Sequence, residues 1–287
     1  MINKAIILAG GAGTRLHPLT SVLSKQMLGV YDKPMIYYPL SLMLQAGITD
    51  FAIVCTPEHK DLYVKTLSSL HINATFTFIL QYAPKGIAEA FILCREFISN
   101  DAVALILGDN LFHGSGLNLT AGRQLKSGAQ IYGKRVHNPQ DYGVAIVKNH
   151  KVVKIVEKPA VFLSDLAIPG LYFYDKTVVS RALKLKPSAR GELEITDLNN
   201  SYIEDKALHL DVLDDSVAWF DTGSFDSLFE ASMYIKTVQS RTGCQIGLPE
   251  EAALKSGSIK KRALLKRLQT AKRTPHVSYL INKYSKL

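Results

Sequence analysis

Glycines and basic residues near the start of the chain have the types and spacing of a phosphate-binding loop. They follow a short apolar run over 5–8, which predicts a buried strand. The glycines are Gly10, Gly11 and Gly13. A loop of this kind can turn its backbone N–H groups toward phosphate oxygens. Arg15 and Lys25 add two positive charges, so the segment predicts a site for a nucleoside triphosphate.

Two familiar phosphate-binding motifs do not fit this loop. A Walker loop needs Gly-Lys-Ser/Thr after its spacer residues, and the chain contains no such triplet. The dinucleotide fingerprint needs a further glycine three residues after the second, but Leu16 stands three residues after Gly13. The loop therefore indicates a different class of nucleotide site.

Two carboxylates from distant parts of the chain each follow an apolar stretch. Asp109 comes after the run 103–107 and Gly108, and Asp221 follows Trp219 and Phe220. Two such carboxylates can share one Mg²⁺, which usually also binds phosphate oxygens and water. The alternative is an aspartate that caps a loop or helix, and the accompanying glycine loop favours the metal.

The sequence offers no protein nucleophile. No Ser, Cys or His stands in a triad-like or elbow motif, and we expect His17 and His113 to be loop residues rather than bases. Transfer between phosphates needs no nucleophile from the protein, because positioning and charge neutralisation do most of the work.

Strands and helices alternate through the first half of the chain. Apolar runs predict strands at 5–8, 52–55, 74–80 and 102–107, and helices are predicted around 36–47, 58–69 and 86–98. This order predicts an α/β fold with a three-layer, Rossmann-like mixed sheet that is mostly parallel. Ligands of such sheets bind beyond the carboxyl ends of strands, where the glycine loop and Asp109 both fall.

The second half predicts a sugar-binding insertion and then a helical segment. Its predicted elements are strands at 142–147, 152–156, 171–174 and 208–213, and helices at 192–204 and, capped by Ser224, at 224–240. We expect a catalytic domain over 1–241, with its sugar-binding part at about 130–222. The remainder, 242–287, is expected to serve in packing or assembly.

The positive charge belongs to the C-terminal tail. The chain has a net charge of +9, yet positions 1–251 hold 24 basic and 25 acidic residues, a net charge of −1. A tail with ten Lys or Arg and no acidic residue could bind nucleic acid or an anionic surface. A solvated helical surface, or one that meets an acidic patch of another subunit, is favoured because no nucleic-acid motif accompanies the charge.

The end of the tail predicts an amphipathic helix. Thr274 followed by Pro275 is a good helix start, and an apolar stripe follows. The stripe consists of Val277, Leu280, Ile281, Tyr284 and Leu287. It must be buried on its own domain or on a neighbour.

Composition points to a cytoplasmic globular protein. At 287 residues the chain can bury a full core, and 47% hydrophobic with 21% charged residues is ordinary for such a protein. We expect no secretory signal and no membrane-spanning segment. Cys55, Cys94 and Cys244 lack metal-site spacing and are expected to be reduced core residues.

Six segments together resemble the glucose-1-phosphate thymidylyltransferases, a family of sugar-1-phosphate nucleotidyltransferases. They are the loop at 8–26 and the segments 31–40, 107–110, 157–159, 186–197 and 219–223. Tyr-Tyr-Pro-Leu at 37–40 and Pro-Ser-Ala-Arg-Gly-Glu at 187–192 are specific to this branch. The resemblance covers about residues 4–255.

The resemblance implies a reaction and its cofactor. A thymidylyl group passes from dTTP to glucose 1-phosphate by Mg²⁺-dependent, in-line single displacement, which gives dTDP-glucose and pyrophosphate for deoxysugar and polysaccharide biosynthesis. Clustered cations suit this chemistry, because it brings two anionic phosphates together. The resemblance also implies a homotetramer or dimer.

The resemblance assigns roles residue by residue. The implied nucleotide-binding residues are Leu8, Gly10, Gly11, Gly13, Thr14, Arg15, Lys25, Gln26, Gln81, Pro84, Gly86 and Asp109. Those implied for the sugar phosphate are Asn110, Tyr142, Gly143, Glu157, Lys158, Gly170 and Arg190. Arg15, Lys25 and Lys158 carry the catalytic charges, with Mg²⁺ held by Asp109 and Asp221. Gln81 and Gly86 read the edge of thymine.

Several positions depart from the family pattern and keep alternatives open. Tyr82, Lys85 and Glu89 stand where the family usually has Pro, Asp and Gln, and Pro169 replaces a typical Thr. Gly29 stands where the family usually has Pro. The same chemistry with UTP or another sugar 1-phosphate is therefore an alternative. A weakly catalytic nucleotide-binding protein with a tail that contacts nucleic acid is a second alternative, disfavoured by the intact charged set.

Overall fold

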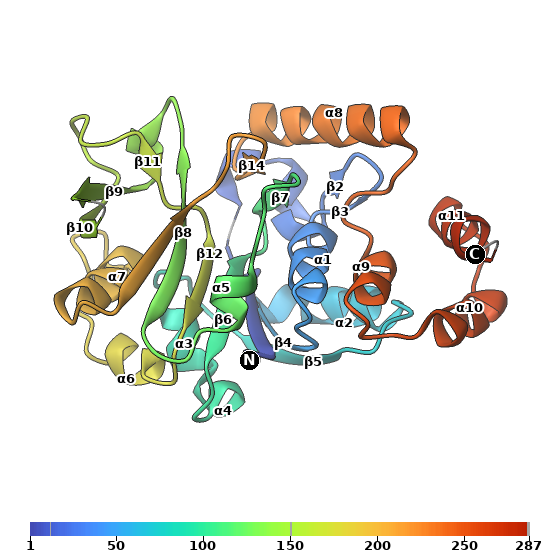
Figure 1. Cartoon of the computed structure of the whole chain (residues 1–287), viewed down its shortest axis with the longest axis horizontal. Helices are drawn as coiled ribbons and strands as arrows, with labels where there is room; N and C mark the ends of the chain where they lie inside the picture. Colours follow the sequence, from blue (N-terminus) through green and yellow to red (C-terminus); the bar gives the residue numbers. More distant parts are fainter. Residues whose placement is uncertain (12, 150, 286–287) are drawn as a thin grey trace.

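The computed structural model describes residues 1–11, 13–149 and 151–285. Its centre is a ten-stranded sheet with helices packed against both faces (Figure 1). The strands of this sheet are β1 (Lys4–Leu8), β4 (Asp50–Cys55), β5 (Thr75–Leu80), β6 (Val103–Leu107), β8 (Ala129–Arg135), β9 (Gly143–Lys148), β10 (Lys151–Glu157), β11 (Leu166–Ala167), β12 (Leu171–Tyr174) and β13 (Leu208–Val212). They lie in the order β10-β9-β11-β8-β12-β6-β1-β4-β5, and β13 pairs with β8.

Two short ribbons lie outside the sheet. They are formed by β2 (Gly29–Val30) with β3 (Lys33–Pro34), and by β7 (Leu111–His113) with β14 (Ala218–Phe220). The α-helices are α1 (Tyr37–Gln45), α2 (Lys60–Ser68), α3 (Glu89–Leu93), α4 (Arg95–Ile98), α5 (Thr120–Arg123), α6 (Val178–Ala182), α7 (Ile195–Glu204), α8 (Phe225–Thr242), α9 (Pro249–Lys255), α10 (Lys261–Thr270) and α11 (Pro275–Tyr284). Short 3₁₀ helices are η1 (Thr14–Leu16), η2 (Leu19–Ser21), η3 (Lys25–Met27), η4 (Pro57–His59) and η5 (Pro139–Asp141).

The parallel half of the sheet confirms the fold predicted from the sequence. Strands β6, β1, β4 and β5 are all parallel, and helices cross between them. Strands β1, β4 and β6 are buried on both faces, which explains why they read as continuous apolar runs, whereas β5 at the edge of the sheet is only partly buried. In β1, Ile7 lies in the core cluster beneath α1, while Ile6 faces the cluster that contains α3, α6 and α7.

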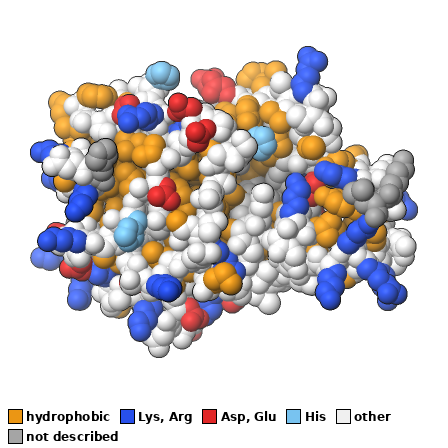
Figure 2. All heavy atoms as spheres, viewed as in Figure 1, with side chains coloured by type: hydrophobic (Ala, Val, Ile, Leu, Met, Phe, Trp, Pro, Cys, Tyr) orange, Lys and Arg blue, Asp and Glu red, His pale blue; other side chains and the backbone are white. Residues whose placement is uncertain are grey.

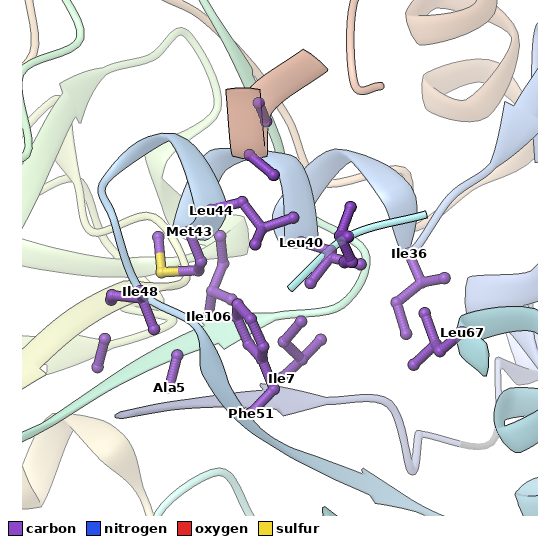
Figure 3. Packing of buried hydrophobic residues seen from close by; sticks show 14 of the residues in the cluster. Ala5, Ile7, Ile36, Leu40, Met43, Leu44, Ile48, Phe51, Leu67 and Ile106 are labelled. Carbon is purple, nitrogen blue, oxygen red and sulfur yellow. The ribbon is translucent and has the colours of Figure 1, made fainter. Parts of the chain in front are cut away.

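Helix α1 packs directly on this sheet. Leu40 and Leu44 of the helix lie over Ile7 of β1, Phe51 of β4 and Ile106 of β6 (Figure 3). These side chains are fully buried, and burying each one stabilises the fold by about 1.5–3 kcal/mol. The packing holds the carboxyl ends of β1 and β6 in a fixed relation, and the candidate site is built there.

The second half of the chain extends the same sheet. Strand β12 pairs antiparallel with β6 and β8, and the short β11 joins β8 to β9 and β10. Strand β8 was not predicted, because Gln130 and Gly133 interrupt its apolar pattern. A side chain at Gly133 would press on Leu166 and Leu210, so close packing of neighbouring strands requires glycine there.

The structure contains the predicted helices, but several begin or end at other residues. The helix predicted at 86–98 is divided into α3 and α4 at Cys94, and α7 starts at Ile195 rather than at 192. Ser224 caps α8 in a reciprocal capping box with Ser227, as expected from a serine at that position. Thr274 caps α11 by accepting a hydrogen bond from the backbone N–H of Val277.

The C-terminal helices pack on the chain's own core. Leu280 of α11 is buried, Val277, Ile281 and Tyr284 contact the same cluster, and Leu287 lies outside the described residues. Lysines and arginines gather over α10 and α11 (Figure 2). Part of the tail charge is neutralised internally, because Lys255 and Lys283 both pair with buried Glu251 of α9.

Two expectations about single residues were wrong. Cys55 and Cys94 are buried thiols, but Cys244 is exposed just after α8, because it follows the helix end at Gly243. His113 lies in strand β7 and not in a loop, with Nδ1 2.8 Å from the Tyr234 hydroxyl. Among the described helices, none combines the length and apolar character needed to cross a membrane.

Candidate active site

The glycine loop follows β1 at the carboxyl edge of the sheet. Gly13 has a φ of 60°, and a Cβ there would lie 2.9 Å from Thr20 and 3.2 Å from Lys25, so this turn requires glycine. Gly10 packs against the side-chain amide of Gln81. Gly11, Thr14 and Arg15 are exposed beside the loop, and Ala12 lies outside the described residues.

Lys25 and Asp109 are brought together where the loops after β1 and β6 meet. The Gly108 backbone N–H donates to the Leu8 carbonyl oxygen at 2.9 Å, which ties the two strand ends together. The Lys25 ammonium lies 2.6 Å from a carboxylate oxygen of Asp109. Its side chain is 8% exposed, so the charge is held close to the protein.

Gln26 is held beneath the same loop. Its Oε1 accepts hydrogen bonds from Ser24 at 2.8 Å and from Tyr63 at 3.3 Å. Tyr63 also donates to the carbonyl of Ala9 at 3.3 Å. This buried network fixes the orientation of Gln26, and its amide N–H₂ group is the end not used by these contacts.

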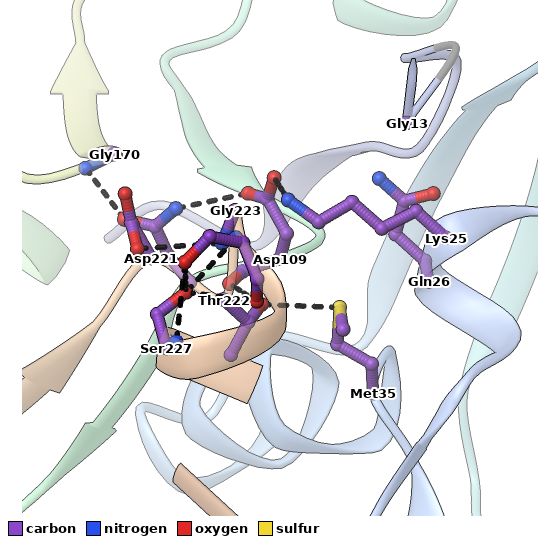
Figure 4. Close-up of polar contacts among 12 residues, drawn as sticks. Gly13, Lys25, Gln26, Met35, Asp109, Gly170, Asp221, Thr222, Gly223 and Ser227 are labelled. Carbon is purple, nitrogen blue, oxygen red and sulfur yellow. Dashed lines mark hydrogen bonds and ion pairs between the residues drawn. The ribbon is translucent and has the colours of Figure 1, made fainter. Parts of the chain in front are cut away.

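The second carboxylate reaches the site through the ribbon of β7 and β14. Phe220 pairs with Leu111, so Asp221 lies next to Asp109 and Asn110 although it is far away in the sequence (Figure 4). The Gly223 backbone N–H donates to Asp221 at 3.3 Å. A Cβ on Gly223 would lie 2.8 Å from the Arg15 guanidinium and 3.4 Å from the Asp221 carboxylate, which brings Arg15 to the same place.

Thr222 joins the two aspartate loops. It is fully buried with a φ of 40°, a rare conformation for a β-branched residue. Its hydroxyl donates to the backbone carbonyl of Asp109 at 2.6 Å, and Met35 lies beside it (Figure 4). Strained residues of this kind persist where the surrounding structure holds them, and they cluster at functional sites.

The side chain of Asn110 forms hydrogen bonds with three neighbouring groups of the site. Its amide nitrogen donates to Asp109 at 2.9 Å, and its oxygen accepts from the Gly170 N–H and the Trp219 indole. The side chain is therefore placed to orient Asp109 and Gly170. Trp219 lies in the segment 219–223 that carries the family resemblance, but no role was predicted for it from the sequence.

Tyr142 lies beside Asp221 and Trp219. Its ring lies 4.9 Å from that of Trp219, and its hydroxyl donates to Asp221 at 3.3 Å. Burial and the negative charge of Asp221 raise the pKa of Tyr142 to about 12, so the phenol stays neutral at physiological pH.

Glu157 and its neighbours form a second wall. Glu157 accepts a hydrogen bond from Thr196 at 2.6 Å, and it packs so closely on Gly143 that a Cβ there would lie 3.1 Å from the carboxylate. Lys158 has a φ of 41°, and its backbone N–H donates to the Tyr142 carbonyl. Its side chain is exposed. Thr196 is a further contact that sequence reasoning missed.

Arg190 is surrounded by carboxylates. Its guanidinium donates to both oxygens of Glu194 at 2.9 and 2.8 Å, and Glu192 and Glu157 lie 3.3 and 3.7 Å away. Partial burial lowers the pKa of Arg190, but the hydrogen bonds to Glu194 and the three negative charges outweigh it and raise the net value. The structure does not place this side chain against Lys158, its expected partner at the sugar phosphate.

A third group of residues lies at the end of β5. Gln81 is buried against Gly10, and the loop that follows it contains Gly86 with a φ of 98°. Backbone hydrogen bonds join this loop to Leu193, which accepts from Ala88 and donates to Lys85. Pro84 is exposed in this loop. Leu8, at the end of β1, is half-buried.

The site thus has three parts along one edge of the sheet. The cations and aspartates lie between the glycine loop and β6, the Glu157 wall lies beyond them, and Gln81 lies on the opposite side. Within the described residues, no cluster of three or more His, Cys, Asp and Glu side chains could hold a metal alone. A cation bound by Asp109 and Asp221 would need phosphate oxygens or water to complete its ligands, as Mg²⁺ usually does.

Comparison with known proteins decides the family. Residues 4–238 match the model of the family described as nucleotidyl transferase. The chain belongs to this family. Within it the chain belongs to the glucose-1-phosphate thymidylyltransferases, which confirms the resemblance found in the sequence. As a nucleotidyl transferase it is an enzyme.

Named relatives cover most of the chain. A glucose-1-phosphate thymidylyltransferase from Xanthomonas campestris pv. campestris (strain B100) is 47% identical over 90% of this chain and 88% of that protein. One from Mycolicibacterium smegmatis is 43% identical over 97% of this chain and 98% of that protein. A crystal structure from Bacillus anthracis, described as a glucose-1-phosphate thymidylyltransferase in complex with a sucrose, has a TM-score of 0.75 and 39% identity. The match covers 80% of this chain and 94% of the Bacillus anthracis chain.

Proposed function

We propose that this nucleotidyl transferase joins dTTP and glucose 1-phosphate to give dTDP-glucose and pyrophosphate. The observation that carries the proposal is the Lys25–Asp109 pair beside Asp221 and Arg15, directly next to the glycine loop. Two phosphates can approach one another only where their negative charges are neutralised, which Arg15 and Lys25 would do together with a cation held by the two aspartates. The names of the relatives supply the nucleotide and the sugar.

Asp109 and Asp221 are the residues that would hold Mg²⁺. Both are carboxylates on adjacent loops, which is the donor set that Mg²⁺ prefers; a hydrogen bond holds the backbone of Asp109, and another holds the carboxylate of Asp221. When bound, Mg²⁺ neutralises phosphate oxygens and orients the reacting groups. Asn110 and Thr222 would keep Asp109 in place, since one binds its carboxylate and the other its carbonyl.

The glycine loop and its basic residues would bind the triphosphate. Gly10, Gly11, Gly13 and Thr14 offer backbone groups, Arg15 and Lys25 neutralise charge, and Gln26 presents its amide. The base would lie toward β5, between Leu8 and Pro84, where Gln81 and Gly86 reach its edge. This direction follows because the opposite side of the loop is occupied by the charged cluster.

The acceptor sugar would bind against the second wall. The residues proposed for it are Asn110, Tyr142, Gly143, Glu157, Gly170, Lys158 and Arg190. Lys158 is exposed and free to meet the phosphate, whereas Arg190 must exchange its contact with Glu194 for the phosphate. In-line attack by that phosphate on the α-phosphorus then releases pyrophosphate.

We propose that 1–241 form the catalytic domain, with about 130–222 for the sugar. Residues 242–287 would serve in packing and in assembly of a homodimer or homotetramer. The proposal rests on the tail's contacts with the core, through Leu280 and Glu251. Sedimentation velocity of the full chain measures the assembly.

Release of pyrophosphate tests the reaction directly. The full chain is given Mg²⁺, one of dTTP, UTP, ATP, GTP or CTP, and either glucose 1-phosphate or another sugar 1-phosphate. Release with dTTP far above the rest supports the proposal, and preference for UTP moves the chain to the first alternative. Release with another sugar 1-phosphate alone would assign that sugar instead, as Pro169 allows. If no combination of nucleotide and sugar 1-phosphate released pyrophosphate, the proposed function would be contradicted.

A further inference from the structure

A carboxylate of the protein itself holds Arg190. The Arg190 Nε lies 3.2 Å from Oε1 of Glu194, and its Nη2 lies 2.9 and 2.8 Å from the two carboxylate oxygens. A guanidinium binds phosphate through the same planar fork of N–H groups that it presents to a carboxylate. Glu194 and an arriving phosphate therefore compete for the same donors of Arg190.

The two partners of this contact differ in their freedom to move. The Glu194 side chain is 9% exposed, and its Oε1 also accepts a hydrogen bond from the Ser188 hydroxyl at 2.6 Å. Glu194 directly precedes α7, where a negative charge is favourable. The Arg190 side chain is 43% exposed. When the contact breaks, we expect the guanidinium to move and the carboxylate to stay.

The turn that carries Arg190 is closed by its backbone. The Ser188 N–H donates to the Glu192 carbonyl at 2.8 Å, and the Gly191 N–H donates to the Ser188 carbonyl at 2.8 Å. The Glu194 side chain takes no part in these two hydrogen bonds. Loss of its carboxylate should therefore free the Arg190 side chain without opening the turn.

The surroundings of Arg190 are negative overall. Besides Glu194, carboxylate oxygens of Glu192 and Glu157 lie 3.3 and 3.7 Å from Nη2. Three carboxylates against one guanidinium leave two negative charges unmatched. Like charges repel, so an anionic sugar phosphate meets repulsion here as well as competition for Arg190. Both effects weaken its binding.

We propose that Glu194 is a positioning residue that withholds Arg190 from the acceptor until a phosphate displaces the carboxylate. The inference rests on the proposed function, which puts the phosphate of the sugar at Lys158 and Arg190. The contact with Glu194 breaks before the phosphate attacks, so it acts on binding of the sugar phosphate and not on the chemical step. Glu194 thereby raises the concentration of sugar 1-phosphate that the reaction needs.

The KM for glucose 1-phosphate at saturating dTTP and Mg²⁺ tests this role. Glu194→Gln removes the charge and one of the two acceptor oxygens. We expect it to lower this KM by about three- to tenfold, the effect of weakening one charged hydrogen-bonded contact. The kcat and the KM for dTTP should stay unchanged, because only binding of the acceptor is affected. Tighter binding of one substrate is a gain that damage to the fold does not produce.

A second variant keeps the charge and alters only the reach of the side chain. Glu194→Asp shortens it by one CH₂ group, which loosens the contact with Arg190. It should lower the KM for glucose 1-phosphate by a smaller factor than Glu194→Gln. If Glu194→Gln does not fold, a lowered KM in Glu194→Asp supports the inference and an unchanged or raised KM overturns it.

Glu192→Gln is the matched control, because it removes an equal charge 3.3 Å from the same guanidinium at a side chain that is 42% exposed. It should lower the KM less than Glu194→Gln does. Equal effects of the two variants would assign the change to general charge and overturn the inference. An unchanged KM in Glu194→Gln would overturn it too, and a raised KM would show that Glu194 presents Arg190 to the phosphate. The proposed function survives each of these results, and only absence of turnover in the wild-type chain contradicts it.

Discussion

The ammonium of Lys25 lies 2.6 Å from the carboxylate of Asp109, although the residues are 84 positions apart. The pair forms because parallel strands β1 and β6 end at the same edge of the sheet. Each partner has a further task in the proposed reaction: Lys25 with the triphosphate and Asp109 with the metal. The pair thus holds a cation and a metal ligand in reach of one another before substrate binds.

Removal of either partner should stop the reaction without unfolding the chain. For Asp109→Asn and Lys25→Ala we expect pyrophosphate release to fall by about 10²–10³-fold, the usual effect of removing one group that stabilises charge in the transition state. The side chain of Asp109 is 24% exposed and is not part of the buried core, so its replacement should leave the fold intact. Asp61→Asn, an exposed aspartate on α2, is the control. Retained activity, or loss of the thermal unfolding transition, would count against these roles.

The hydroxyl of Thr222 should matter more than its size. Thr222→Val keeps the shape but leaves the Asp109 carbonyl without its buried donor, which should destabilise the fold by about 1–3 kcal/mol. We also expect weaker use of Mg²⁺, because the Asp109 loop loses its link to Asp221. Denaturant unfolding and a Mg²⁺ titration of activity measure the two effects. Thr222→Ser retains the donor and should restore both, and equal damage from Ser and Val would refute the hydrogen-bond explanation.

One cysteine should react with thiol reagents in the native protein. Burial raises the pKa of Cys55 to about 11 and that of Cys94 further, so neither forms a thiolate at neutral pH. Cys244 is exposed. We expect one equivalent of reagent to be consumed quickly, three after unfolding, and none quickly in Cys244→Ser. Fast reaction of a second thiol would contradict the burial of Cys55 and Cys94.

Much of the fold was predictable because its signals are local. The strands β1, β4 and β6 are buried on both faces and show as apolar runs, and Ser224 and Thr274 mark helix starts by their side chains. Strand β8 was missed because its glycine is explained only by Leu166 and Leu210, which are distant in sequence.

The candidate site was predictable as a set of residues but not as a geometry. The glycine loop, Asp109 and Asp221 each follow an apolar stretch, and this alone could indicate their place at a sheet edge. The hydrogen bond by which Thr222 links the two aspartate loops depends on a positive φ, which the residue type does not predict. The contacts between Arg190 and its neighbouring carboxylates depend on how the turn 186–194 folds back. The spacing of the charged residues in the sequence does not reveal this fold.

The contacts of Glu251 predict that acid loosens the C-terminal helix. Burial raises the pKa of Glu251, but hydrogen bonds from Lys283 and Tyr284 and the charges of Lys255 and Lys283 outweigh it, so the net pKa lies below its ordinary 4.5. A carboxyl with a lowered pKa stabilises the fold fully above its ordinary value, and this stability is lost as pH falls through the folded value. Asp32, which contacts His276 of α11, also has a lowered pKa, so protonation of Glu251 and Asp32 weakens the polar contacts that each makes with the helix.

A comparison of wild type with Glu251→Gln isolates this effect. At pH 7 the variant should unfold with about 1–3 kcal/mol less free energy, because an amide replaces the charge that Lys283 and Tyr284 bind. Below pH 4.5 the difference should shrink, since wild type then carries a protonated carboxyl too. Trypsin should also cut the variant after Arg273 faster at pH 7, because α11 is held less firmly. Glu230→Gln, on the exposed face of α8, should change neither quantity. A difference in stability that stays constant from pH 7 to pH 3 would show that the charge of Glu251 does not hold the helix.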